Sequence, residues 1–231
     1  MLRYVGPFSF GLLLLAALAF WPMYLSKNWA EIDRYTHAHA LLGTLWLLVL
    51  LVQPILILRG YRLRHRMVGR TSLFVALGFV LSSFLLTHFR VSRMTEAAFA
   101  KEGIHIYLPL AIAVLFATAC VFGMHWRKSA PVHARFMFST ALMLVDPVLA
   151  RVMFFYLPRL PSDHLYQGIT FALIAAVMVY LVNSLPPRTP GRSWYRNYCL
   201  GTVAILALYF AVPYTDAWLA FSNWFRVLPL T

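Results

Sequence analysis

Stretches of about 20 mostly apolar residues recur along the whole 231-residue chain, separated by short polar segments. A helix of that length crosses a hydrocarbon core of about 30 Å, and inside lipid only helices or closed barrels satisfy every backbone polar group. Charged residues make up 12% of the chain, about half of the roughly 25% that soluble domains carry. The sequence therefore predicts an all-α polytopic membrane protein, with one integral membrane domain over residues 1–231.

Seven transmembrane helices are predicted from these apolar runs. The second to fifth are expected to form a four-helix core, and an amphipathic tail follows the seventh. The first run has no small-residue cleavage site, so it is predicted to be a retained helix rather than a signal peptide. The predicted helices are Pro7–Leu25, His37–Leu58, Met67–Phe89, Ile104–His125, Val132–Leu157, Tyr166–Leu185 and Tyr198–Trp218, with the tail at Leu219–Thr231.

The net charge of +13 comes from basic residues in short loops between the apolar runs. The loops after the second, fourth and sixth helices are basic and contain no acid, whereas the other three are mixed or weakly charged. By the positive-inside rule, the amino terminus is then cytoplasmic and the carboxyl terminus lies outside. The expected partner of the basic residues is the lipid bilayer, through its anionic headgroups, and not nucleic acid.

Familiar cofactor motifs are missing from the sequence. The lysines Lys27, Lys101 and Lys128 all lie in loops, which excludes a retinal Schiff base in the seventh helix. There is no Walker-type glycine loop, no CxxC and no GxSxG. The two cysteines, Cys120 and Cys199, are predicted to be buried packing residues and not a disulfide.

Four histidines, one near the start of each of four successive helices, are the pattern that points to chemistry. They form two hairpin pairs, His39 with His65 and His105 with His133, at intervals of 26 and 28 residues. Two parallel hairpins can pack about an axis along the membrane normal. His39 would then face His105 at the outer side, and His65 would face His133 at the inner side.

Two neutral imidazoles on opposing helices are what six-coordinate haem iron needs. The pattern therefore predicts two b-type haems, ~20–30 Å apart along the helices, in a transmembrane electron carrier. Whether such a carrier is also an enzyme, for example a membrane oxidoreductase, stays open. Arg66 and Arg135 are candidates for holding haem propionates at the inner side, although positive-inside residues need no such role.

This layout resembles the ascorbate-reducible diheme b-type cytochromes, in which four consecutive helices supply one histidine each. The resemblance covers about His39 to Arg151 and rests on order and spacing. It implies that the first histidine pairs with the third and the second with the fourth. The chain departs from that family in having seven predicted spans rather than six, and histidines close to the helix ends.

A second resemblance is carried by short strings that begin at His39 (HALLG), His65 (HRMVGR) and His133 (HARFM). They resemble an uncharacterised family of bacterial predicted membrane proteins. That resemblance implies no activity. Together with the charge rule, it implies a bacterial inner membrane.

Two other functions fit the same residues. His37, His39, His88 and His105 would all lie on the outer side and could form a copper or zinc site of a membrane enzyme or metal-handling protein. Alternatively, the histidines are ordinary helix-end residues. The chain is then a cofactor-free structural or assembly subunit of a larger membrane complex.

Three polar residues fall inside predicted helices. Gln53 is expected near mid-membrane, where an amide usually bonds to a neighbouring helix. Asp146 and Arg151 lie in the fifth helix, and an intramembrane ionisable residue is a functional candidate by default. Asp146 is expected to pair with Arg151 or with a group on another helix. Pro147 is expected to bend the helix between them.

Overall fold

The computed structural model describes residues 2–231, with the side chains of Leu2, Arg3, Ile104 and Asp163 left aside. Within these residues the chain is 82% helical and has no strand. Seven helical stretches are long and apolar enough to span a membrane, which confirms the predicted all-α polytopic fold. The helices are α1 (Leu2–Phe20), α2 (Arg34–Leu58), α3 (Arg62–Ser92), α4 (Glu96–Glu102), α5 (Tyr107–His125), α6 (Ala130–Leu142), α7 (Val145–Tyr156), α8 (Asp163–Asn183), α9 (Arg192–Leu208) and α10 (Asp216–Arg226).

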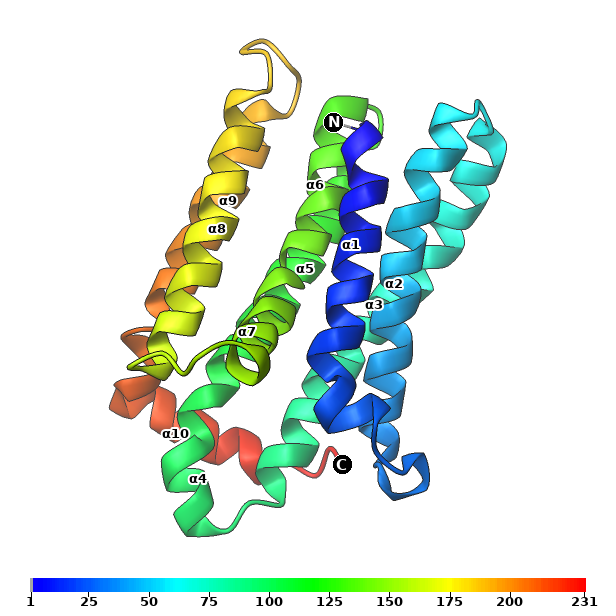
Figure 1. The fold of residues 1–231 in the computed structure, drawn as a ribbon. Coiled ribbons are helices and arrows are strands. Elements are labelled where there is room, and N and C mark those ends of the chain that lie inside the picture. The colour runs from blue at the N-terminus through cyan, green and yellow to red at the C-terminus, as the bar shows by residue number, and fades with distance from the viewer. Residues whose placement is uncertain (1) are drawn as a thin grey trace.

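The long helices run side by side and place the two chain termini at opposite ends of the bundle (Figure 1). The connections at residues 59–61, 126–129 and 184–191 share one end, which we call the basic end. The short helices α4 and α10 lie at the other end, which we call the α10 end. Helix α2 packs between α1 and α3, α3 packs on α5, and α5 packs on α6. The four predicted core helices are therefore neighbours, and α1 joins them by packing on both α2 and α7.

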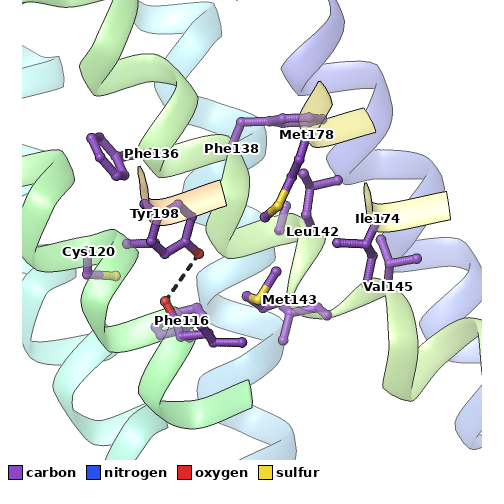
Figure 2. Close-up of a cluster of buried hydrophobic side chains, with 14 of the residues drawn as sticks. Phe116, Cys120, Phe136, Phe138, Leu142, Met143, Val145, Ile174, Met178 and Tyr198 are labelled. Atoms are coloured by element: carbon purple, nitrogen blue, oxygen red, sulfur yellow. Dashed lines mark hydrogen bonds between the residues drawn. The ribbon is translucent and has the colours of Figure 1, made fainter. Parts of the chain in front are cut away.

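The centre of the bundle is a cluster of buried apolar side chains from all the long helices, α1 to α3 and α5 to α9. Figure 2 shows its aromatic, aliphatic and sulfur-containing side chains from α5 to α9. Phe116, Phe136 and Met178 are fully buried in it. The hydroxyl of Tyr198 donates to the carbonyl of Leu115 over 3.3 Å, so its polar atom is satisfied inside the cluster. Both cysteines are free and buried, as predicted.

Large apolar side chains also cover the outside of the bundle. Phe74, Val121 and Tyr180 are 79%, 63% and 69% exposed. Extended apolar surface of this kind is rare on soluble monomers, whereas lipid tails solvate it. The exposed side chains therefore support a lipid environment around the helices.

The predicted fifth helix is interrupted in the structure. It is continuous as α6 up to Leu142 and resumes as α7 at Val145. A proline ring clashes with the carbonyl four residues earlier, which for Pro147 is the carbonyl of Met143. The interruption falls at that residue, and Pro147 sits in the first turn of α7, where a missing N–H costs nothing.

Three other boundaries differ from the prediction. Helix α3 starts at Arg62, not Met67, so His65 belongs to a helical turn and not to a loop. The predicted loop before the fourth helix contains α4, which the Thr95 side chain caps. The carboxyl-terminal tail forms α10, where Arg226 pairs with Glu96 of α4 over 2.9 Å. Helices α4 and α10 have only 7 and 11 residues, so a search for apolar runs of about 20 residues does not detect them.

Asp33 fixes the start of α2 and thereby the position of the histidines that follow. Its carboxylate accepts hydrogen bonds of 2.8 Å from both the backbone N–H and the hydroxyl of Thr36. Partial burial by itself raises the pKa of Asp33. These hydrogen bonds to the charged form outweigh it and lower the pKa below its ordinary value.

Candidate functional site

His65 and His133 lie side by side at the basic end of the bundle. His65 is in the first turn of α3 and His133 is in the first turn of α6, so one comes from each of the two hairpins. Their ring centroids are 6.5 Å apart and the rings are nearly perpendicular, at 89°. The structure thus brings together the second and fourth histidines of the sequence pattern.

His133 is held in one orientation by a backbone carbonyl. Its Nδ1 lies 2.7 Å from the carbonyl oxygen of Gly123 in α5. Since a carbonyl can only accept, Nδ1 carries the hydrogen, and in the neutral ring Nε2 then keeps its lone pair. A histidine that ligates a metal usually donates its other N–H in this way. The α5–α6 hairpin therefore leaves Nε2 as the His133 ring nitrogen that could coordinate a metal ion.

His65 and Gln53 bring unsatisfied polar atoms to the same place. The Gln53 side chain donates to the His65 backbone carbonyl over 3.4 Å, while its own Oε1 is buried without a partner. The Nδ1 atom of His65 is also buried without a partner. Buried polar atoms are nearly always hydrogen-bonded, so such a pair of exceptions calls for an explanation.

Gln53, expected near mid-membrane, contacts the first turn of α3 in the structure. It lies five residues before the end of α2 at Leu58, only about 7.5 Å of helix from the basic end. The residue therefore belongs to the surroundings of His65.

The number and spacing of the ligand side chains indicate which metal centre the histidine pair could hold. Two metal–imidazole bonds of about 2 Å, together with the two ring radii, place ring centroids roughly 6 Å apart, close to the separation that the structure shows. Zinc and copper sites need three or four protein ligands. No group of three or more His, Cys, Asp or Glu side chains is placed to hold a metal ion within the described part of the chain. Two imidazoles could serve as the protein ligands of haem iron, whose other four ligands come from the macrocycle.

The two arginines predicted beside this site differ. Arg66 is exposed, and its charge acts on the His65 imidazole. Arg135 is 7% exposed and uses its three nitrogens to bond the Leu181 carbonyl, the Pro131 carbonyl and the Ser184 hydroxyl at 2.9–3.0 Å. Its contacts to Leu181 and Ser184 tie α6 to the end of α8, which gives it a packing role.

His39 and His105 have separate partners in the structure. The His39 Nδ1 lies 3.1 Å from the Ser82 hydroxyl, and its ring stacks on Phe79 with centroids 4.8 Å apart. Phe79 also fills the space next to Gly43, where an added Cβ would lie 3.0 Å from the ring. His105 is exposed and lies 3.8 Å from Glu102. The structure therefore does not draw the predicted outer pair together as it does the inner pair.

The other two histidines of the alternative outer metal site are also engaged elsewhere. His37 lies 2.9 Å from the Tyr24 hydroxyl and 3.0 Å from the Trp29 carbonyl. His88 is 1% exposed, and its Nδ1 lies 2.7 Å from the Thr231 hydroxyl. These contacts anchor the chain around α2 and α3, and they do not assemble a common ligand set.

Asp146 and Arg151 lie in α7 and do not form an ion pair. The two ion pairs among the described residues both lie at the α10 end. Asp146 is 3% exposed and accepts a hydrogen bond from the Thr170 hydroxyl of α8. Arg151 donates to the Pro147 carbonyl over 2.7 Å and lies over the Phe20 ring of α1. Of the two expected partners for Asp146, the structure shows the one on another helix.

Several residues that position these groups carry no recognisable sequence signal. Thr170 and Gly123 are ordinary members of apolar helices, and only the packing of distant segments shows that they contact Asp146 and His133. Thr140 accepts the Nε1–H of the fully buried Trp46 over 3.0 Å, which joins α6 to α2. Comparison with protein-family models, curated proteins and solved structures finds no match for this chain.

Proposed function

We propose that the chain is a membrane-embedded electron carrier that holds a b-type haem between His65 and His133. The observation that carries the proposal is the meeting of these two imidazoles, at a centroid distance of 6.5 Å, from two separate helical hairpins. The perpendicular ring planes do not oppose it, because each imidazole can rotate about its own bond to the metal. The chain would carry lipid on its outer surface and exchange electrons with a redox partner or another membrane subunit.

The residues around the pair have distinct roles in this proposal. His133 is oriented by the Gly123 carbonyl, and His65 is fixed by the first turn of α3. The buried side chains of Val132 and Phe136 keep water away from the His133 side. Arg66 supplies positive charge beside His65 for an anionic group such as a propionate. When bound, a haem supplies reversible one-electron chemistry at this end of the bundle.

A second haem between His39 and His105 belongs to the same proposal, because transfer across the bilayer needs a site at each end. It would require Phe79 and Ser82 to move away from His39. The positive-inside rule places the basic end, and with it the His65–His133 pair, on the cytoplasmic side. On this reading the membrane is a bacterial inner membrane.

The test is the visible absorption spectrum of the purified chain in detergent, oxidised and then reduced with dithionite, after expression with haem supplied. We expect the Soret and sharp reduced bands of low-spin b-type haem. The variants His65→Ala and His133→Ala should each lose at least nine-tenths of the haem of this site. His125→Ala is the matched control, because His125 is exposed at the same end and stacks on Trp194.

The haem count separates the remaining functions. Two haems per chain, one of them lost in His39→Ala and His105→Ala, would establish the outer pair as well. A colourless protein would overturn the proposal. Elemental analysis for copper and zinc would then distinguish the outer metal site from a cofactor-free structural subunit.

A further inference from the structure

The turn between α8 and α9 forms a cavity of about 320 Å³ at the basic end. Three arginines line it, Arg188, Arg192 and Arg196, together with Thr189 and Ser193. The three arginines are four residues apart in sequence, so the last two share one face of α9. Guanidinium groups and hydroxyls are the donors that recognise phosphate oxygens.

No acid is available to neutralise these arginines. The seven acids of the chain are Glu31, Asp33, Glu96, Glu102, Asp146, Asp163 and Asp216, and none lies in the three connections of the basic end. Neither of the ion pairs that the described residues form involves these arginines. Their counter-charge must therefore come from outside the chain.

One donor of the cluster is buried and has no partner. The Nε–H of Arg192 is inaccessible to solvent and lacks an acceptor among the described atoms. The first turn of α9 adds backbone N–H groups and the positive end of a 17-residue helix. Both features add positive charge next to the cavity, where an anion would be attracted.

The turn is held rigidly enough to keep this arrangement. Gly191 adopts a φ of +85°, and a Cβ there would lie 2.7 Å from the Trp126 ring. The Ser129 hydroxyl donates to the Pro190 carbonyl over 3.0 Å, which fastens the turn to the α5–α6 connection. A preorganised turn loses little entropy when it binds a ligand.

We propose that this cavity is a binding site for a phosphate monoester or diester group, supplied by the headgroup of an anionic phospholipid. The site lies at the basic end, beside the start of the candidate membrane span Arg192–Tyr214, and basic segments next to a span attract anionic headgroups. It is separate from the histidine pair and does not depend on haem.

Native mass spectrometry of the full chain in detergent, titrated with phosphatidylglycerol, tests the proposal. Phosphatidylcholine is the zwitterionic control, and inorganic phosphate is the competitor. We expect one retained phosphatidylglycerol, at least fivefold weaker retention in Arg192→Gln and in Arg196→Gln, and no such loss in Arg64→Gln. Arg64 is an exposed arginine of the same end, so its variant removes the same charge elsewhere. Thermal unfolding of each variant verifies that it is folded.

The outcomes distinguish specific binding in this cavity from general attraction of anions to the positive charge of the basic end. Displacement by millimolar inorganic phosphate would show that the site takes the phosphate group from either source. Retention against it would assign the site to the lipid headgroup. Equal loss in Arg64→Gln, or equal retention of phosphatidylcholine, would overturn the proposal.

Discussion

Gly123 gives the sharpest test of the packing that orients His133. The variant Gly123→Ala places a Cβ 2.7 Å from the Met137 Sδ and 3.3 Å from the Phe136 Cβ. The sulfur is at the far end of a flexible side chain and can move. The Phe136 Cβ is attached to the backbone of α6 and moves only with the helix. Overpacking of this kind costs about 1–3 kcal/mol, and displacement of α6 would also disturb the His133–Gly123 hydrogen bond.

Gly201→Ala is the control that separates the cost of overpacking from the difference in helix propensity. Alanine is favoured over glycine inside a helix by about 1 kcal/mol, and Gly201→Ala should show this gain alone, because no atom lies within 4 Å of its added Cβ. The free energy of unfolding, measured by circular dichroism in mixed micelles, should therefore be about 1–3 kcal/mol lower for Gly123→Ala than for Gly201→Ala.

The second substitution Met137→Ala supplies the decisive control. In Gly123→Ala it removes the closer of the two clashes, so the loss should be partly recovered, as a positive coupling energy in a double-mutant cycle. If Gly123→Ala stabilises the chain as much as Gly201→Ala does, the close contact between α5 and α6 is refuted. The inferred orientation of His133 would fall with it.

Three further predictions follow from single hydrogen-bonding residues. Arg135→Met should lower the free energy of unfolding by roughly 2–4 kcal/mol, because it breaks two hydrogen bonds that tie α6 to the end of α8 and one within α6; an unchanged midpoint in the same unfolding assay would refute this packing role. Thr140→Val leaves the buried Trp46 Nε1–H without an acceptor and should cost about 1–3 kcal/mol. Thr118→Val should be nearly silent, because the Thr118 hydroxyl bonds only the Val114 carbonyl of its own helix. The pKa of Asp33 is lowered in the folded chain, so its stabilisation is complete above the ordinary value of 3.8 and is lost as the pH falls through the folded value. As the pH is lowered from about 6 to about 2, the unfolding midpoint should therefore fall less steeply in Asp33→Asn than in the unmodified chain. An equal slope in the two proteins would contradict the capping role of the Asp33 carboxylate.

The sequence could predict which histidines pair, but it could not predict which of the two pairs meets in the structure. Equal spacing within two hairpins predicts that His65 faces His133, and the rings are neighbours. The same spacing predicts that His39 faces His105, yet Phe79 stacks on His39 and His105 lies at the surface. Spacing gives the level of a residue along a helix, whereas the rotation of the helix and the neighbouring side chains decide what it meets.

The sequence by itself determined the number of spans, the sharing of one end by the basic connections and the break near Pro147. These features are local: in lipid each helix must satisfy its own backbone, so length and apolar composition reveal it, and a proline acts on the carbonyl four residues before it. Only the tertiary structure decided that Arg135 serves packing, that Asp146 bonds to Thr170 and that Gly123 orients His133. Those contacts join different helices, and their formation depends on which helices pack together and in which rotation, information that no single apolar run contains.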